Sequence, residues 1–445
     1  MGKRKIGRYS LSYSVIKGIA KFWHNRVYNR RVIAIGRDNF NKDAHNILVG
    51  NHQNALMDAL AIIFTSPGQP TFLTRASVFK NKFIARILYH FKMIPVFRPR
   101  DGWETVKQND DTFLKTIDII KHKNGLGVMP EGNHAGYRRL RQLQKGVCRI
   151  AFQTEESENF ELDIQIVPIA VEYSHYFKFR PVVTVTYGKS FGFKELHDLY
   201  REKPQLALNA LRDKIYDRLK ELMVHIETED DYEAINELRE IANGKYNTDT
   251  VHPKVVRDKV LIRQMEIAAE NNNDLYREIC NKSLKIKNIS QSLNIGYYRL
   301  NQKKPRLVIQ TLYSIGLVLL APLALFGFVT NLVFHRVPYL ALKNIKDEQF
   351  LSTVRFVVSL VLAILFIPIY IILAFLFIPS WWIATLVLLC ILPSGWLAWN
   401  YFVVWKKLRE GVRVRKCINR KNPEYKILTN IYKDLMLDIG KLKIV

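Results

Sequence analysis

The stretch Asn46-Ile-Leu-Val-Gly-Asn-His-Gln-Asn-Ala-Leu-Met-Asp58 passes from an apolar run into a polar turn and then into a helix-like segment. This pattern is typical of a strand, a loop and a helix in an α/β fold. The turn carries His52, and Asp58 falls in the first turn of the following helix. Because imidazole titrates near neutral pH and a fixed carboxylate can hold one tautomer, the pair can act as a general base with its orienting group. The alternative is a histidine that only satisfies backbone groups of the turn.

A second apolar run, Gly125-Leu-Gly-Val-Met129, ends in the turn Pro130-Glu131-Gly132-Asn133-His134. Ile94-Pro-Val-Phe-Arg98 lies between the two turns, and Ile166-Val-Pro-Ile-Ala-Val171 follows them. These four ordered blocks, within about residues 45–190, resemble the glycerolipid acyltransferase family, which includes the glycerol-3-phosphate, lysophosphatidate and dihydroxyacetone phosphate acyltransferases. Four blocks in order are far more specific than either turn alone.

Two details depart from the usual pattern of that family. Asp58 stands six positions after His52 instead of five, and Pro-Glu-Gly is followed by Asn133-His134 where the family has Thr-Arg. Both details resemble the fungal-type glycerol-3-phosphate and dihydroxyacetone phosphate acyltransferases. This looser resemblance favours glycerol-3-phosphate as the acceptor without fixing it.

The resemblance implies acyl transfer from a thioester of coenzyme A or acyl carrier protein to a glycerol hydroxyl. His52 would remove the hydroxyl proton and Asp58 would orient the imidazole and stabilise its charge. Glu131 would hold either the acceptor glycerol or the turn itself. Backbone amides near Gly132 are candidates for stabilising the oxyanion. No metal or prosthetic group is implied, and the acyl thioester is a co-substrate.

The resemblance also implies a role for Arg98, which aligns with an arginine that binds phosphate in the family. Arg100 stands two positions on and would face the same way in an extended chain, so the two guanidinium groups could grip one phosphate. The alternative is an exposed pair in a basic protein. The arginine of the family's third block is replaced by His134, and the sequence cannot choose among His134, Arg138, Arg139 and Arg141 as its substitute.

The chain predicts an α/β acyltransferase domain over residues 36–195, with a central parallel or mixed sheet flanked by helices. The predicted strands are 32–35, 47–49, 71–74, 93–97, 127–129, 164–171 and 182–187. Sites in such sheets form at the carboxyl ends of strands, where His52, Arg98 and Glu131 fall. Residues 196–305 are predicted to form a charged helical accessory region, in which the apolar rhythm of residues 207–226 indicates packing.

Residues 1–35 are basic, contain no acidic residue, and place apolar side chains three and four positions apart. This pattern predicts an amphipathic segment that associates with anionic lipid, with Trp23 at the depth of the headgroups. The alternative is a helix that packs on its own domain.

A membrane domain is predicted over residues 306–405. Its first segment, 307–334, contains Pro322 and Gly327, and a helical hairpin follows over 356–404. The tail of residues 406–445 begins with a dense basic cluster, which the positive-inside rule places in the cytoplasm. Because basic residues also precede the first segment, that segment is predicted to be re-entrant, with a bend near Pro322, rather than spanning. We therefore expect an integral membrane protein with its catalytic domain on the cytoplasmic face.

A net charge of +27 over 445 residues is compatible with nucleic acid, anionic lipid or acidic substrates as partners. The chain carries no zinc-finger, RNA-recognition or helix-turn-helix signature, so we expect a membrane phospholipid surface and no nucleic acid. The four cysteines, at 148, 280, 390 and 417, show no metal-binding spacing.

The expected function is that of a glycerol-3-phosphate O-acyltransferase, which acylates the sn-1 hydroxyl to give lysophosphatidate for phospholipid biosynthesis. The nearest alternative is a 1-acylglycerol-3-phosphate (lysophosphatidate) acyltransferase. A noncatalytic membrane protein that binds lipid with the same fold is a third reading, and an intact set of His52, Asp58 and Glu131 counts against it.

Overall fold

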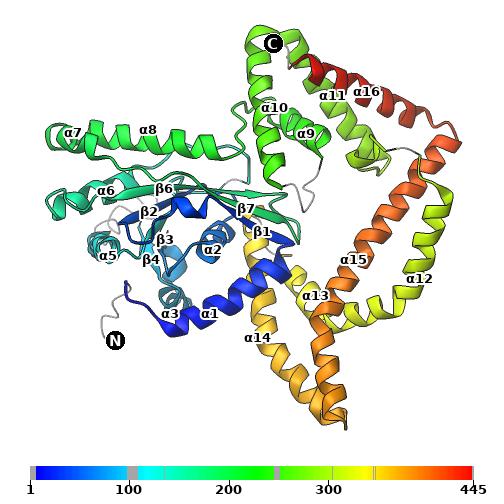
Figure 1. The fold of residues 1–445 in the computed structure, drawn as a ribbon, viewed down its shortest axis with the longest axis horizontal. Coiled ribbons are helices and arrows are strands. Elements are labelled where there is room, and N and C mark those ends of the chain that lie inside the picture. Colours follow the sequence, from blue (N-terminus) through cyan, green and yellow to red (C-terminus); the bar gives the residue numbers. More distant parts are fainter. Residues whose placement is uncertain are drawn as a thin grey trace. The chain divides into compact units, whose positions relative to one another are not determined.

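The computed structural model describes residues 7–97, 109–134, 136–244, 251–302, 304–343, 345 and 347–442. The chain divides into two compact units. Unit 1 comprises Met1–His225 together with Lys346–Thr353, and unit 2 comprises Ile226–Ile345 together with Val354–Val445. Figure 1 labels the helices and strands of both units.

Unit 1 is built on a seven-stranded sheet with the strand order β1-β7-β6-β2-β5-β3-β4. All seven strands expected from the sequence are present: β1 (Arg31–Ile35), β2 (Asn46–Gly50), β3 (Thr71–Arg75), β4 (Met93–Val96), β5 (Leu126–Val128), β6 (Gln165–Tyr173) and β7 (Val182–Tyr187). Neighbouring strands are parallel except β6 and β7, which are antiparallel. The predicted mixed α/β class is therefore confirmed.

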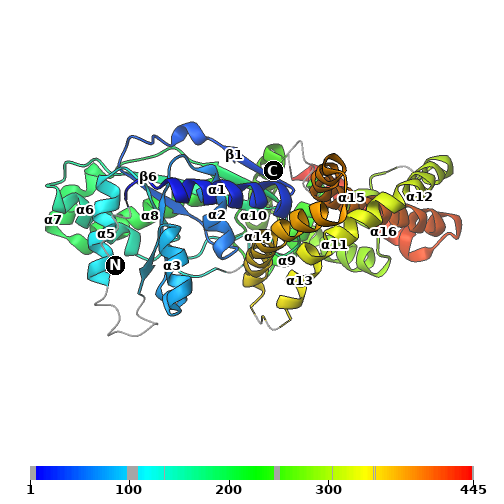
Figure 2. The ribbon, with the colours of Figure 1, turned by 90° about the horizontal axis from the view of Figure 1, so that it is seen from below.

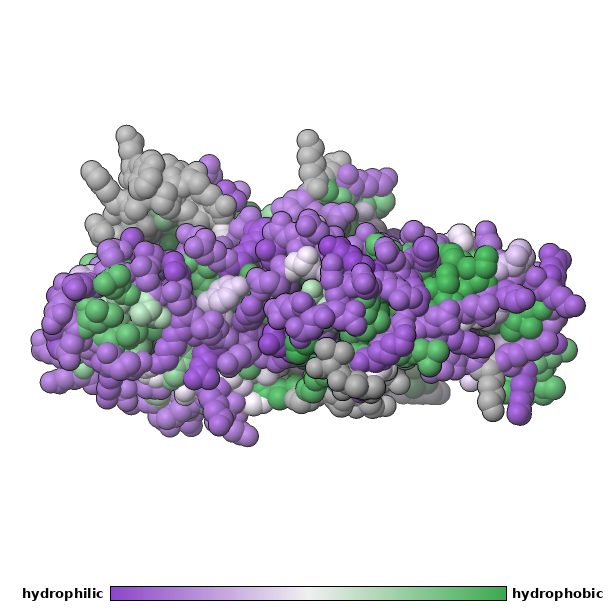
Figure 3. Space-filling model, turned by 90° about the horizontal axis from the view of Figure 1, so that it is seen from above, coloured by the Kyte–Doolittle hydropathy of each residue, from purple (hydrophilic) through white to green (hydrophobic). Residues whose placement is uncertain are grey.

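Helices cover both faces of this sheet (Figures 1 and 2). One face carries α1 (Leu11–Phe22), α2 (Leu56–Thr65) and α3 (Lys82–His90). The other carries α6 (Gly146–Ser157), α7 (His197–Glu202) and α8 (Pro204–Leu222), and α5 (Asn109–Lys121) packs against α6. The outer surface over α7 and α8 is mainly hydrophilic (Figure 3), as expected for a face in water.

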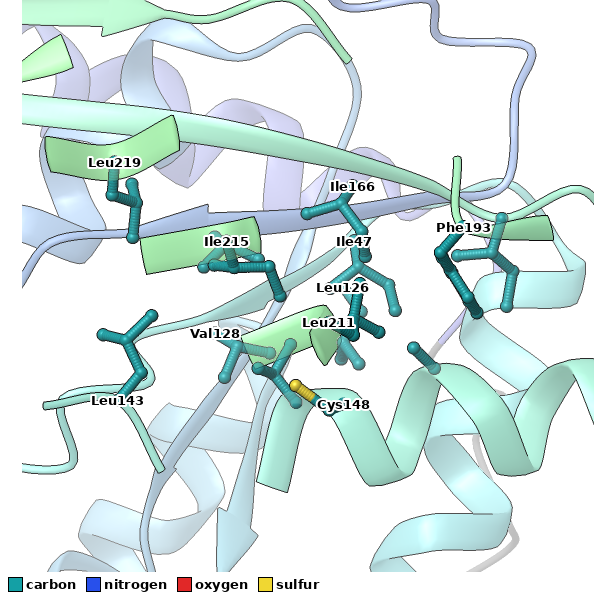
Figure 4. Close-up of a cluster of buried hydrophobic side chains, with 14 of the residues drawn as sticks. Ile47, Leu126, Val128, Leu143, Cys148, Ile166, Phe193, Leu211, Ile215 and Leu219 are labelled. Atoms are coloured by element: carbon teal, nitrogen blue, oxygen red, sulfur yellow. The ribbon is translucent and has the colours of Figure 1, made fainter. Parts of the chain in front are cut away.

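The main hydrophobic core of unit 1 lies between the sheet and α6 and α8. Figure 4 shows part of this cluster, with Ile47, Leu126, Val128, Leu143, Cys148, Ile166, Phe193, Leu211, Ile215 and Leu219 labelled. Fully burying a side chain of this size contributes roughly 1.5–3 kcal/mol. Because the apolar stripe of α8 closes this core, the catalytic unit extends to His225, beyond the boundary at residue 195 that the sequence predicts.

Residues 11–22 form the predicted amphipathic helix, α1. Tyr13 and Ala20 face the core of the unit, while Leu11, Val15, Ile19 and Phe22 are exposed. The helix continues into a π-helical turn, Trp23–Tyr28, which changes the side chains that face inward. Trp23 is 4% exposed, so the expectation that it sits at headgroup depth is wrong.

Unit 2 is helical. Its helices are α9 (Tyr232–Asn243), α10 (Val251–Asn271), α11 (Asn273–Ser292), α12 (Leu307–Thr330), α13 (Leu332–Ala341), most of α14 (Leu351–Phe377), α15 (Trp381–Asn419) and α16 (Pro423–Lys441). The helix α11 packs against α9, α10 and α16. Within the described residues, three helices are long and apolar enough to cross a membrane, at Leu307–Thr330, Glu348–Phe377 and Trp381–Asn419. The helices α14 and α15 occupy the segment in which the hairpin is predicted and are joined by residues 378–380.

The first apolar segment forms a continuous helix, and whether it is re-entrant or spanning stays a prediction. The helix α12 continues through Pro322 and ends at Thr330, so Pro322 is not a helix break. Its 24 residues span about 36 Å, which exceeds the roughly 30 Å of a bilayer core. The break comes instead at Asn331, whose Nδ2 donates to the carbonyls of Gly327 at 3.0 Å and Ile391 at 2.9 Å.

Candidate active site

His52 lies in the loop between β2 and α2, beside the carboxylate of Asp58. The distance from His52 Nδ1 to Asp58 Oδ2 is 3.1 Å, and Asp58 is fully buried while 19% of the His52 side chain is exposed. A carboxylate oxygen accepts, so Nδ1 carries the ring proton and Nε2 is the acceptor of the ring. The exposed part of the imidazole can therefore take a proton from a substrate hydroxyl.

Asp58 also fixes the loop itself. The same oxygen, Oδ2, accepts from the amides of Gln53 at 2.8 Å and Asn54 at 2.7 Å. The loop holds Ala55 at φ 45°, a region that an alanine rarely adopts and that costs on the order of 1–3 kcal/mol. The six-residue spacing from His52 to Asp58 is accommodated by this turn, in which a single oxygen accepts from two amides and the imidazole.

Glu131 joins the two predicted turns. It is buried, and its Oε1 accepts from the amide of His52 at 2.7 Å while its Oε2 accepts from the amide of Arg141 at 3.2 Å. Of the two roles left open by the sequence, this geometry favours holding the turn. Burial raises the pKa of Glu131 to about 8, although the two amides favour the charged form.

Gln53 is a second link between the turns. Its carbonyl accepts from the amide of Gly136 at 3.1 Å, and its Nε2 donates to the carbonyl of Arg139 at 3.0 Å. Gly132 has φ 64°, which favours glycine, and its amide donates to the carbonyl of Met129 at 3.2 Å. The amide of Gly132 is therefore used within the turn.

His134 lies against His52. Their ring centroids are 5.2 Å apart in an edge-to-face arrangement. Burial, together with the neighbouring His52, lowers the pKa of His134, while Gln349 and the carboxylates of Asp347 and Asp58 oppose that shift. The structure therefore brings His52, Asp58, Glu131 and His134 together, with Gly132 in the adjoining turn.

The arginines that the sequence singles out differ in where the structure places them. Arg98 and Arg100 lie outside the described residues. Arg138 is buried, with its Nη1 2.7 Å from Glu172 Oε2 and its Nη2 2.6 Å from the carbonyl of Tyr173, so it is a structural residue. The side chain of Arg141 is exposed and its charge lowers the pKa of Glu131, opposing the effect of burial. Of these two candidates for the missing arginine, Arg141 is therefore exposed and Arg138 is buried.

Two features of this site were missed from the sequence. The buried Tyr173, near the end of β6, has Asp58 as an electrostatic neighbour, and burial followed by that carboxylate raises its pKa well above the usual value. The residues Gln349 and Phe350 contact His134 from a segment 215 positions further along the chain. No local pattern in the sequence could have paired positions so far apart. In the described residues, no group of three or more His, Cys, Asp or Glu side chains could hold a metal ion.

His52 and Asp58 thus lie together after β2, a central strand of the α/β sheet. Residues 31–172, which contain both, match the family model described as Acyltransferase. Residues 31–172 therefore form an acyltransferase family domain, and the chain is similar to glycerolipid acyltransferases.

Within that family, the chain is similar to two yeast enzymes. It is 27% identical over 248 residues to Glycerol-3-phosphate O-acyltransferase 1 of Saccharomyces cerevisiae, covering 53% of this chain and 31% of the yeast protein. It is 25% identical over 112 residues to Glycerol-3-phosphate O-acyltransferase 2 of the same yeast, covering 25% of this chain and 15% of that protein. The chain thus spans about a third or less of the length of these relatives.

A solved structure also shows a likeness. The 1-acyl-sn-glycerophosphate (LPA) acyltransferase, PlsC, from Thermotoga maritima aligns with a TM-score of 0.32 and 18% sequence identity. The alignment covers 45% of this chain and 79% of that chain.

Proposed function

We propose that this protein is a glycerol-3-phosphate O-acyltransferase, which transfers a fatty acyl group from an acyl thioester to the sn-1 hydroxyl and releases lysophosphatidate. The observation that carries the proposal is the buried Asp58 carboxylate 3.1 Å from His52 Nδ1, which leaves Nε2 as the acceptor on a partly exposed ring. The similarity to two yeast glycerol-3-phosphate acyltransferases supports this choice of acceptor.

The reaction proceeds by general-base catalysis. His52 Nε2 takes the proton of the hydroxyl as its oxygen attacks the thioester carbonyl, and a tetrahedral oxyanion forms. Asp58 stabilises the imidazolium that results. The carbon–sulfur bond then breaks, the carbonyl reforms as an ester, and the imidazolium returns the proton to the leaving thiolate. Every proton is accounted for by His52, with the thioester of coenzyme A or acyl carrier protein as the only co-substrate.

The phosphate of the acceptor requires cationic partners. Arg98 and Arg100 take this role by resemblance to the family, and Arg141 adds a third guanidinium close to Glu131. The basic charge of the whole chain, +27, would also raise the local concentration of an anionic acceptor.

The product is a lipid, and the chain has the means to hold it at a membrane. The exposed side chains Leu11, Val15, Ile19 and Phe22 of α1, with Lys17 and Lys21 among them, suit an anionic phospholipid surface. The basic residues that follow the apolar half of α15 favour a cytoplasmic location for that end under the positive-inside rule. The catalytic unit would then work on the cytoplasmic face.

An acceptor assay on the full chain in detergent tests the proposal. Wild type and His52→Ala receive labelled glycerol-3-phosphate or lysophosphatidate, with acyl-coenzyme A or acyl carrier protein, and the products are separated by lipid class. Acylation of glycerol-3-phosphate that is lost in His52→Ala is the expected result. Reaction with lysophosphatidate alone would identify the protein as a lysophosphatidate acyltransferase instead. An absence of any His52-dependent product would overturn the assignment in favour of a lipid-binding protein.

A further inference from the structure

Residues 347–352, which lead from α13 into α14, pack onto unit 1. The buried Ser352 fixes the end of this segment. Its carbonyl accepts from the hydroxyl of Tyr28 at 2.9 Å, and its own hydroxyl donates to the carbonyl of Tyr176 at 2.6 Å. That same carbonyl of Tyr176 accepts from Nδ2 of Asn54 at 3.2 Å. The segment is therefore tied to the loop that carries His52.

The middle of the segment reaches His134. A short 3-10 turn, Glu348–Phe350, starts at Asp347, whose side chain accepts from the amide of Gln349 at 3.1 Å. From this turn, Oε1 of Gln349 makes a hydrogen bond with Nδ1 of His134, and the ring of Phe350 lies 4.8 Å from the His134 ring, edge to face. His134 is thus held by the segment on one side and by His52 on the other.

This contact sets the tautomer of His134. An amide oxygen can only accept, so with Oε1 of Gln349 toward the ring, Nδ1 carries the proton and Nε2 is the acceptor. Asp58 imposes the same tautomer on His52 through its own Nδ1. Two neighbouring imidazoles therefore each present Nε2 as an acceptor.

Resting on the function proposed above, we propose that Gln349 is a positioning residue that fixes His134 as the acceptor for the second hydroxyl of a glycerol-type diol, beside the hydroxyl that His52 deprotonates. The ring of Phe350 packs against His134. A site with two adjacent acceptors suits glycerol-3-phosphate, which has two neighbouring hydroxyls, better than lysophosphatidate, which has one. A site built to hydrogen-bond a hydroxyl disfavours an acceptor that lacks it, because a buried polar group is then left without a partner.

The contact itself can be tested without any assay of activity. In the full chain, His134→Cys combined with Gln349→Cys should form a disulfide under mild oxidation, and protease cleavage between the two positions should then leave the fragments linked until reduction. Each single substitution alone controls for pairing with the native cysteines. Fragments that separate without reduction would overturn the juxtaposition on which the proposal depends.

The role of the contact is tested by kinetics with two acceptors, glycerol-3-phosphate and its single-hydroxyl analogue 3-hydroxypropyl phosphate. Gln349→Leu should raise KM for glycerol-3-phosphate roughly tenfold, the scale of one hydrogen bond, and leave KM for the analogue within about twofold. The control Glu348→Gln changes an exposed neighbour in the same turn and should behave as wild type.

Gln349→Glu separates positioning from packing. It keeps an oxygen for Nδ1 of His134, so KM for the diol should return toward the wild-type value above neutral pH. The added carboxylate should also favour the imidazolium, in a setting where His52, Asp58 and Asp347 already act on the ring, and shift the acidic limb of kcat/KM to higher pH.

The outcomes are distinguishable. Equal changes of KM with both acceptors, or an unmoved pH profile in Gln349→Glu, would overturn the positioning role while His52-dependent acylation still stands. A fully active His52→Ala would overturn the proposed function, and the acceptor role given to His134 would fall with it.

Discussion

The two histidine-bearing turns of unit 1 are held in place by very different parts of the chain. His52 is oriented by Asp58, six positions away, and the same oxygen binds two amides of the intervening loop. His134 is held by Gln349, which lies 215 positions away at the start of an apolar helix. The ring of His52 is therefore oriented within its own strand, loop and helix, although Glu131 and Gln53 also link this loop to the second turn. The ring of His134 requires a distant segment to dock.

The largest effect on activity should come from replacing Asp58, the carboxylate that orients His52. Asp58→Asn should lower kcat by about 10²–10⁴-fold, because an amide carries no charge to stabilise the imidazolium and can present its own N–H to Nδ1. The measurement is kcat with saturating acyl thioester and acceptor. Asp118→Asn, at an exposed position, is the matched control. A kcat within threefold of wild type would show that His52 does not depend on its neighbour.

The distantly held turn has its own anchor in Arg138, four positions after His134. Arg138→Leu should reduce the free energy of unfolding of unit 1 by about 3–5 kcal/mol, because Glu172 is then left buried without its guanidinium. Thermal or denaturant unfolding measures this loss. Adding Glu172→Leu should recover part of it, since the unpaired charge is then removed. If Arg138→Leu is as stable as wild type, the ion pair with Glu172 does not stabilise unit 1.

Glu131 links the two turns, and its pKa gives that link a dependence on pH. Because burial raises the pKa from 4.5 to about 8, the folded state binds a proton that the unfolded state releases between these values. The contribution of Glu131 to the free energy of unfolding should therefore be greatest below pH 4.5. It should fall as the pH rises toward 8, by at most about 1.4 kcal/mol per pH unit.

The test compares unfolding midpoints of wild type and Glu131→Gln from pH 5 to pH 8. The glutamine does not titrate, so the difference between the two proteins should narrow or reverse as the pH rises. A constant difference across this range would mean that the carboxyl group stays ionised between its two amides.

The smallest effect is expected at the anchor of the distant segment. Ser352→Ala removes the hydrogen bond to the carbonyl of Tyr176 and should cost about 0.5–1.5 kcal/mol in stability. The loss should raise KM for the acceptor more than it lowers kcat, because the segment contacts the ring of His134 directly. Glu348→Gln serves again as the control. An equal fall in kcat and kcat/KM would place the segment closer to the reacting atoms than the contacts indicate.

Much of the fold and half of the site could be predicted because their signals are local. Strands alternate with helices over short distances, and His52, Asp58 and Glu131 stand at the ends of apolar runs. The periodicity of α8 predicted that it packs, but a stripe of leucines does not say which surface it covers, so the boundary was placed at residue 195 instead of 225. Trp23 was misplaced for a similar reason, since the π-helical turn alters the face that a regular helix would present.

Contacts over long separations were beyond such reasoning. The sequence contains Gln349 as an ordinary polar residue before an apolar helix, and only the folded chain brings it to His134. The same holds for Arg138, one of four candidates to replace the arginine of the family's third block, which the fold uses in a buried ion pair.

The triple use of one oxygen of Asp58 has a consequence for how such a protein can change over evolutionary time. The fold needs that carboxylate for two backbone amides, whether or not any reaction takes place. A descendant that gave up catalysis would remain under pressure to keep the aspartate. On the proposed mechanism the imidazole of His52 is kept mainly for its chemistry, so in relatives that have lost activity we expect the histidine to change before the aspartate does.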